Sequence, residues 1–212
     1  EFRSRLRTVR KFVEERYVPL LYLLSQSYAD LARTGRGWAT AMCMGVFPHP
    51  DTGEELVRAG VWAGGKDLPF DPGKVMENVR YSWFSASSGG SPFSAPTLAV
   101  DLDKPGAYSF SKAARYDGMP MEVGPHARMW TGDIELSPMG RELAPKYLGV
   151  RARTFRELGE DFVFSIMGRH LARAEETWLI ADAMEGWLDD LVPGENPLLP
   201  MPKVWNGEGY SL

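Results

Sequence analysis

The chain has 212 residues, of which 44% are hydrophobic and 12% aromatic, and its formal net charge is −4. This composition supports a single globular segment over residues 1–212, and the acidic balance argues against a nucleic-acid partner. A single cysteine, Cys43, excludes an internal disulfide and a multi-cysteine metal site within this sequence. No apolar run reaches about 18 residues, so we expect no transmembrane segment.

Apolar residues recur at steps of three and four over residues 2–33, which predicts a long helix. Pro19 lacks a backbone donor and is expected to kink or divide this helix, and Gly35 is placed to end it. The first turns are basic, which is unfavourable at the positive end of a helix dipole. We therefore expect the helix to begin upstream or to pair with acidic groups that this sequence lacks.

Shorter periods between residues 38 and 66 predict strands. The turn residues 48–53 suggest an antiparallel hairpin with a return strand over 56–62. Further along, we expect a short helical turn over 72–78, a serine-rich loop over 85–97, and extended stretches over 98–102 and 108–111. The regions 38–66 and 98–111 would together form a small antiparallel sheet.

Ser137 and Pro138 form a strong helix start, and Pro145 and Gly149 should end that helix. A longer helix is predicted over residues 155–191, opened by a capping box whose first residue is Thr154. The tail from residue 193 is loop-rich.

Gly168 interrupts the helical propensity of this longer helix and is interpreted as a place where another helix comes close. The two predicted long helices, 2–33 and 155–191, should pack through their apolar stripes, with the small sheet beside them. The predicted fold class is therefore α+β, mainly helical.

Residues 112–128, KAARYDGMPMEVGPHAR, interleave backbone-shaping residues, charges and apolar side chains. One interpretation is a tight turn leading into a short helix with solvated charges; the other is a packed segment whose charges are paired. The candidate structural residues in this motif are Lys112, Arg115, Tyr116, Gly118, Pro120, Glu122, Gly124, Pro125 and Arg128.

A second charged motif, GRHLARAEE, spans residues 168–176 inside the predicted long helix. Its candidate residues are Gly168, Arg169, Arg173 and Glu176. A solvated face with ordinary helical ion pairs is one interpretation, with Glu176 in reach of Arg173. The alternative that we favour is an ion-pair network joining Glu122 and Glu176 with Arg115, Arg128, Arg169 or Arg173.

The three histidines, His49, His126 and His170, show no metal-site spacing and are interpreted as surface or packing residues. Cys43 is interpreted as a small buried apolar residue. No phosphate loop, dinucleotide fingerprint or nucleophile elbow is present.

Residues 112–128 resemble the Arg-Tyr-x-Gly-x-Pro-Met-Glu-Val-Gly-Pro-x-Ala-Arg signature of the nickel-iron hydrogenase large subunit. Residues 168–176 resemble the Gly-Arg-x-x-Ala-Arg-Ala-x-Glu helix of the same subunit, and residues 12–19 and 71–83 are similar to further family segments. Ala114 stands where the family usually has proline, and His126 where it usually has leucine, which bears on the subgroup.

The resemblance implies a parent protein that splits hydrogen at a nickel-iron centre held by four cysteine thiolates, with diatomic ligands on the iron. It also implies an iron–sulfur small subunit as partner. Neither cysteine pair nor the family's Glu-Ala-Pro-Arg-Gly stretch occurs here. We therefore expect an interior segment of the large subunit, without metal ligands or catalytic residues of its own. We expect this segment to act as a scaffold and to dock the small subunit.

The alternative is a metal-free relative that kept the scaffold, like the quinone-side subunit of respiratory complex I. The run from Pro120 to Pro125 favours the hydrogenase, because we expect that relative to have diverged there. The expected partners are the rest of the large subunit, the iron–sulfur subunit and hydrogen as substrate. The compartment, at the periplasmic face of the membrane or in the cytoplasm, is left open by the resemblance.

Overall fold

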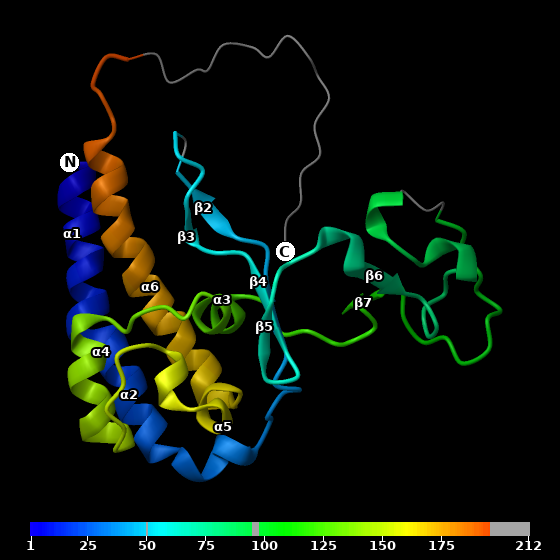
Figure 1. The fold of residues 1–212 in the computed structure, drawn as a ribbon, viewed down its shortest axis with the longest axis horizontal. Coiled ribbons are helices and arrows are strands. Elements are labelled where there is room, and N and C mark those ends of the chain that lie inside the picture. The colour runs from blue at the N-terminus through cyan, green and yellow to red at the C-terminus, as the bar shows by residue number, and fades with distance from the viewer. Residues whose placement is uncertain (50, 95–97, 196–212) are drawn as a thin grey trace.

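The computed structural model describes residues 1–49, 51–94 and 98–195. Helices α1 (Phe2–Phe12), α2 (Val18–Ser27) and α6 (Ile166–Asp189) form one side of the molecule. Short sheets lie beside them, and the ribbon formed by β6 and β7 lies farthest from α1 (Figure 1). The predicted fold class, α+β and mainly helical, is confirmed.

The other elements are short. The remaining α-helices are α3 (Pro125–Thr131), α4 (Pro138–Leu143) and α5 (Glu160–Val163). The strands are β1 (Ala41–Cys43), β2 (Val46–Pro48), β3 (Glu55–Val57), β4 (Gly60–Ala63), β5 (Lys66–Leu68), β6 (Val75–Asn78) and β7 (Ala113–Tyr116).

The predicted helix over residues 2–33 is divided where proline requires it. A wide π-helical turn, Val13–Tyr17, separates α1 from α2, and Pro19 lies in the first turn of α2, where its missing N–H costs least. The α-helix ends at Ser27, and a 3₁₀ segment, Ala29–Arg33, continues to the turn at Gly35, whose φ is 65°.

Four of the five basic residues of α1, Arg3, Arg5, Arg10 and Lys11, find acidic partners within the same chain. Arg10 lies 2.7 Å from Asp182 and 3.0 Å from Glu185 of α6, and Arg3 lies 2.5 Å from Asp189. The expectation that these acidic groups are missing from the sequence is wrong. The two helices lie side by side, as predicted, but no local pattern showed that α6 supplies acidic partners for α1.

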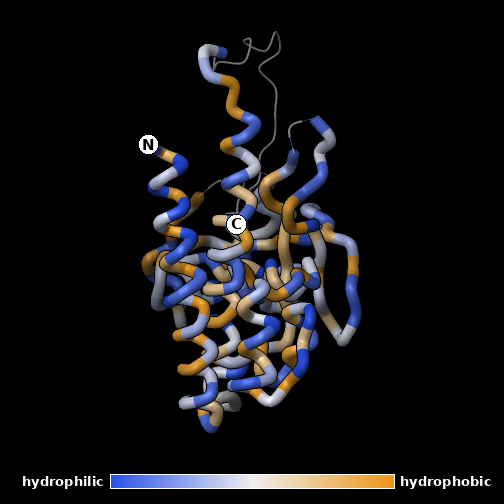
Figure 2. The backbone as a smooth tube through the Cα atoms, turned by 90° about the vertical axis from the view of Figure 1, so that its left-hand side faces the viewer, coloured by the Kyte–Doolittle hydropathy of each residue, from blue (hydrophilic) through white to orange (hydrophobic). Residues whose placement is uncertain are grey.

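The apolar stripes of the long helices face one another, as predicted. The core includes Val18 and Tyr22 of α2 and Leu171 of α6, together with Phe155 and Phe164 from the segment before α6. Figure 2 shows hydrophobic and hydrophilic positions alternating around these helices rather than forming one continuous apolar stretch. Within the part of the chain that the structure describes, no helix is long and apolar enough to cross a membrane.

The predicted hairpin is confirmed, but the sheets are three rather than one in the described residues. The strand order is β1-β4-β5 in one sheet, β2 pairs with β3 in another, and β6 pairs with β7 in the third, all antiparallel. Residues 98–102 and 108–111 form only isolated bridges, such as Phe84 with Val100. Of the predicted helical turn over 72–78, only Pro72–Lys74 is helical, because residues 75–78 pair with the distant strand β7.

Ser137 caps α4 as predicted, since its hydroxyl accepts from the Gly140 amide at 2.9 Å. Pro145 does not end this helical segment, which continues as a π-helical turn, Ala144–Leu148. Gly149, in the left-handed conformation with φ 71°, ends it.

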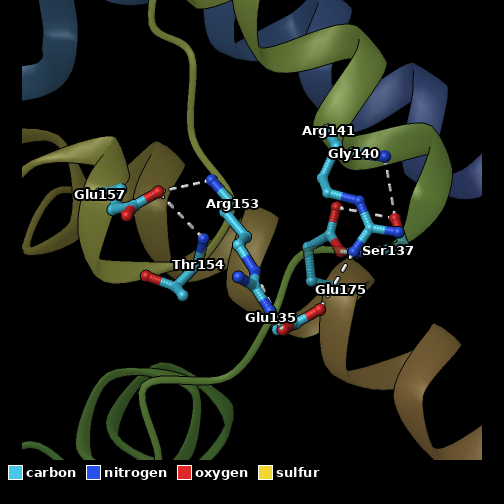
Figure 3. Close-up of polar contacts among 8 residues, drawn as sticks. All are labelled: Glu135, Ser137, Gly140, Arg141, Arg153, Thr154, Glu157 and Glu175. Carbon is cyan, nitrogen blue, oxygen red and sulfur yellow. Dashed lines mark hydrogen bonds and ion pairs between the residues drawn. The ribbon is translucent and has the colours of Figure 1, made fainter.

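The long helix α6 begins later than predicted. The Glu157 carboxylate accepts from the Arg153 and Thr154 amides (Figure 3), but these contacts lie at a short 3₁₀ turn, Arg156–Leu158, and not at the start of α6. Gly159, with φ 92°, then redirects the chain. Ser165 is the true cap of α6, because its hydroxyl accepts from the Gly168 amide at 3.1 Å. The tail expected to be loop-rich lies from residue 196 onward outside the described residues.

Another helix comes close to the long helix α6 at Gly168, as the sequence analysis predicted. A Cβ at this position would overlap the backbone carbonyl oxygens of Phe162 and Val163 in α5. Gly186, on the same helix, has no atom within 4 Å of the corresponding place. The two glycines therefore form a matched pair.

We expect Gly168→Ala to lower the free energy of unfolding by about 1–3 kcal/mol, because the new methyl group must displace backbone. Gly186→Ala should raise it by about 0.5–1 kcal/mol through helix propensity alone. Denaturant unfolding of the protein that carries this chain measures both changes. Equal effects of the two substitutions would contradict the close approach of α5 and α6.

Candidate functional site

The first motif begins on strand β7. Lys112 pairs with Glu77 of the neighbouring segment at 2.6 Å. Tyr116 is buried, and its hydroxyl accepts from the Asp71 amide at 2.9 Å. The chain then reverses at Gly118, whose φ of 77° favours glycine.

Residues 120–124 run beside β1. The Thr40 hydroxyl donates to the Pro120 carbonyl at 2.6 Å. The backbone of Glu122 accepts from the Met42 amide and donates to the Thr40 carbonyl, each at 2.9 Å. Gly124, with φ 84°, turns the chain into α3, which begins at Pro125. The backbone thus fixes the direction in which the carboxylate of Glu122 extends.

Glu122 forms a two-pronged ion pair with Arg169 of α6. The Arg169 Nε donates to Oε2 of Glu122 at 2.8 Å, and Nη2 donates to Oε1. Nη1 of the same guanidinium donates to the Gly35 carbonyl at 2.8 Å. A Cβ at Gly37 would overlap this pair, so a glycine is required there.

Arg128 and Glu176 form a second two-pronged pair. The Arg128 Nε donates to Oε1 of Glu176 at 2.5 Å and Nη2 donates to Oε2 at 2.9 Å. The Glu176 side chain is only 8% exposed. A carboxylate with so little water access is stable as an anion only when it is paired, so this contact holds α3 on α6.

The predicted ion-pair network is confirmed for Glu122, Glu176, Arg128 and Arg169. It does not include Arg115, or Arg173, which is exposed and has no ion-pair partner among the described residues. The reason lies in helix geometry: Arg169 and Glu176 are nearly two full turns apart and share one line toward the first motif, while Arg173 lies to one side of it. What these thirteen motif residues do in function stays a prediction.

A buried carboxylate, Glu175, joins α6 to α2 and to the start of α4, and the sequence analysis missed it; Figure 3 shows its contact with Ser137. It is 1% exposed and accepts from the Tyr22 hydroxyl at 2.9 Å, from the Ser137 amide at 2.7 Å and from the Ser137 hydroxyl at 3.2 Å. Burial raises the pKa of this carboxyl, and the hydrogen bonds oppose that shift. A Cβ at Gly140 would overlap Oε1, so the site also requires this glycine.

One signal could have found Glu175. It stands four residues after Leu171 and three before Trp178, on the apolar stripe of the helix. A glutamate in that register must be buried with partners.

His126 is a buried packing residue, as interpreted. It is 3% exposed, its ring meets Phe164 edge-on at 4.5 Å, and Nδ1 lies 3.3 Å from Oε2 of Glu122. Neither ring nitrogen has a hydrogen-bond partner in the described structure. Burial lowers the pKa of this imidazole to about 4, although the charge of Glu122 opposes the shift. The ring is therefore neutral at pH 7.

The other residues weighed as ligands also have structural surroundings. His49 and His170 are exposed, and Nδ1 of His49 accepts from the Asp51 amide at 3.2 Å. Cys43 is buried, as interpreted, and burial raises the pKa of its thiol.

Comparison with known proteins gives the family. The model of the nickel-dependent hydrogenases matches residues 1–198. The chain is 46% identical, over its whole length, to the large subunit of the periplasmic [NiFeSe] hydrogenase of Desulfomicrobium baculatum, of which it spans 42%. It is 29% identical to the uptake hydrogenase large subunit of Azotobacter chroococcum mcd 1, over 88% of the chain and 35% of that protein.

Solved structures agree with this match. The as-isolated oxidized Ni-Fe-Se hydrogenase of D. vulgaris Hildenborough has a TM-score of 0.89 at 46% identity, over 94% of this chain and 42% of that chain. The reduced, active Ni-Fe-Se hydrogenase of Desulfomicrobium baculatum has a TM-score of 0.89 at 48% identity, over 94% of this chain and 41% of that chain. The chain belongs to the nickel-dependent hydrogenase family, and it spans about two fifths of the length of these relatives.

The described residues do not fit a nickel-iron centre. Within residues 1–49, 51–94 and 98–195, no group of three or more His, Cys, Asp or Glu side chains could hold a metal ion. The sole cysteine, Cys43, accepts from the Gly45 amide at 3.3 Å and has no second thiol near it. The carboxylates of Glu122 and Glu176 are both engaged by arginines.

We expect Glu176→Gln to lower the free energy of unfolding by about 2–4 kcal/mol, because Arg128 loses its counter-charge in a nearly buried place. Glu142→Gln, an exposed change on α4, should alter it by less than about 0.5 kcal/mol. Urea unfolding of the two variants makes the comparison. A loss no larger for Glu176→Gln than for Glu142→Gln would show that this pair does not stabilise the fold.

His126 should make stability depend on pH. Its folded pKa of about 4 lies below the unfolded value near 6.5, so the unfolded chain takes up the proton first as pH falls. This contribution is therefore fully present above pH ~6.5 and is lost by about pH 4, with an upper limit of about 3 kcal/mol. Thermal melting from pH 7 to pH 4 should show a shallower decline for His126→Leu than for the unsubstituted protein; identical slopes would exclude this origin.

Proposed function

We propose that the parent protein is a nickel-dependent hydrogenase that oxidises hydrogen reversibly to protons and electrons, and that this chain is an interior scaffold segment of its large subunit. The family match across residues 1–198 carries the proposal. The nickel-iron centre, with its thiolate and diatomic ligands, would lie in parts of the large subunit outside this sequence. Within residues 1–212, taken as a single segment, no catalytic or metal-binding residue is assigned.

We propose that the two motifs have a structural role, which is to fix the position of the loop against α6. Glu122 and Arg128 bind the first motif to Arg169 and Glu176 of α6, so the loop keeps one shape against a rigid helix. A scaffold that must position ligands supplied by other segments needs this kind of rigidity. Gly118, Gly124 and Pro125 shape the backbone of the motif, while the exposed side chain of Arg173 has no ion-pair partner within the part of the chain that the structure describes.

Exposed apolar side chains support docking to other polypeptides. Trp38 is 77% exposed, Tyr108 74% and Leu102 67%. Apolar surface of this kind is ordinarily covered in assemblies. We propose that the remaining parts of the large subunit and an iron–sulfur small subunit cover it, with electrons passing to the clusters of that subunit. The relative named as periplasmic supports placement at the periplasmic face.

The test is made on the complete protein that contains this chain, purified under anaerobic conditions. We expect about one nickel per large subunit, with iron, by plasma mass spectrometry, together with hydrogen-dependent reduction of a viologen dye. Absence of both nickel and hydrogen oxidation would overturn the proposal and favour the metal-free scaffold alternative.

A separate substitution tests the proposal that the motif acts as a scaffold. Arg169→Gln should lower nickel content and activity together by about tenfold or more, because the misplaced loop would disturb the site as a whole. Glu142→Gln is the matched surface control and should retain both. Full nickel content and activity in Arg169→Gln would separate the motif from any scaffold function.

A further inference from the structure

One cation of the first motif has no acidic partner. Lys112 pairs with Glu77 and Arg128 with Glu176, but Arg115 has no ion pair among the described residues. Its Nη1 donates only to the carbonyl of the preceding residue, Ala114, at 2.7 Å. A guanidinium has five N–H donors, so most of its hydrogen-bonding capacity is unused.

Arg115 lines an open pocket of about 790 Å³ between the β6–β7 ribbon and residues 79–90. In this ribbon it stands opposite Met76. Arg80 lines the same pocket and likewise has no ion-pair partner in the part of the chain that the structure describes; its guanidinium lies 5.1 Å from the centre of the Tyr81 ring. Two unpaired guanidinium groups thus belong to one pocket.

A third cation, Lys104, contributes to the pocket and shapes it. Its ammonium donates to the carbonyls of Val79 at 2.6 Å and Phe84 at 2.7 Å, which ties the loop together and leaves a third proton for another acceptor. The one carboxylate of the lining, Glu77, is already engaged by Lys112.

The pocket is therefore positive in a chain whose net charge is −4. Gly90 and Gly118 lie in its wall, and nothing stands within 4 Å of the place that a Cβ would take at either residue. Clefts lined by one sign of charge concentrate ions of the other sign. Guanidinium groups match oxyanions in shape as well as in charge, because two parallel N–H groups can meet two oxygens.

We propose that this pocket is an oxyanion site, in which a carboxylate or phosphate group binds to Arg115 and Arg80, with Lys104 as a third cation of the lining. The group comes either from a free anion in solution or from an acidic side chain of a polypeptide that covers the pocket. Both sources present the same chemistry to the arginines. The proposal does not depend on hydrogenase activity.

Calorimetric titration of the purified parent protein with inorganic phosphate, at low salt in a buffer free of oxyanions, is the first arm. A free-anion site gives saturable binding that weakens about tenfold or more in both Arg115→Gln and Arg80→Gln, because each loses a charge-assisted contact. Arg115→Lys should weaken it less, since charge remains without the fork. Arg151→Gln, an exposed change elsewhere, should leave it unchanged.

The second arm measures assembly of the same variants by native mass spectrometry. If a carboxylate of a neighbouring polypeptide fills the pocket, phosphate does not bind the assembled protein, and Arg115→Gln and Arg80→Gln raise the dissociation constant of the assembly about tenfold, whereas Arg151→Gln does not. Circular dichroism with melting confirms that Arg115→Lys is folded. Two outcomes would overturn the proposal. In the first, phosphate binds equally well to the unsubstituted protein and to both arginine variants. In the second, phosphate does not bind, and Arg115→Gln and Arg80→Gln assemble as well as the unsubstituted protein.

Discussion

The packing of the first motif on α6 depends on one requirement: charged side chains with little access to water must be paired. Glu122 and Glu176 are held by Arg169 and Arg128, each through two parallel hydrogen bonds. Removing any one of these groups would leave another charged and poorly solvated. The two pairs therefore act as fixed points at which the loop around Glu122 and the short helix α3 are attached to a 24-residue helix, α6.

The same requirement extends to residues that carry no charge. Gly37 leaves room for the Glu122–Arg169 pair, and Gly140 leaves room for the carboxylate of Glu175. Glu175 in turn gathers a hydroxyl from α2 and two donors at the start of α4. Close packing around polar groups explains why small residues cluster near acidic ones, since a methyl group at either glycine would displace an oxygen that has no other place to go.

The two ion pairs also distinguish two parts of the chain: a body that they hold together, and the β6–β7 ribbon, which is held less tightly. The body contains α2, α3 and α6 around one apolar core. The β6–β7 ribbon contributes Tyr116 to a second, smaller apolar cluster, whose other buried members, Met42, Val61 and Ala63, lie on β1 and β4. Arg115 lies on this ribbon, where the carboxylate of Glu77 is engaged by Lys112, and it has no ion-pair partner among the described residues.

The sequence by itself determined the helical class, the existence of a hairpin about the turn at residues 48–53, the cap at Ser137 and the membership of the two motifs in one family. These depend on local periodicity, on turn chemistry and on residue identity, which are all visible in a linear string. Even the pairing of Glu122 and Glu176 with arginines was predictable, because acidic and basic residues of packed motifs need each other.

Only the tertiary structure decided which arginines pair with Glu122 and Glu176. Arg128 and Arg169 lie on facing surfaces of α3 and α6, while Arg173 points away by a fraction of a helical turn. It also decided that Glu175 is buried, that α6 begins at Ile166, and that Val75–Asn78 is a strand. Each of these outcomes depends on partners distant in sequence, and the free energy of such contacts overrides local propensity.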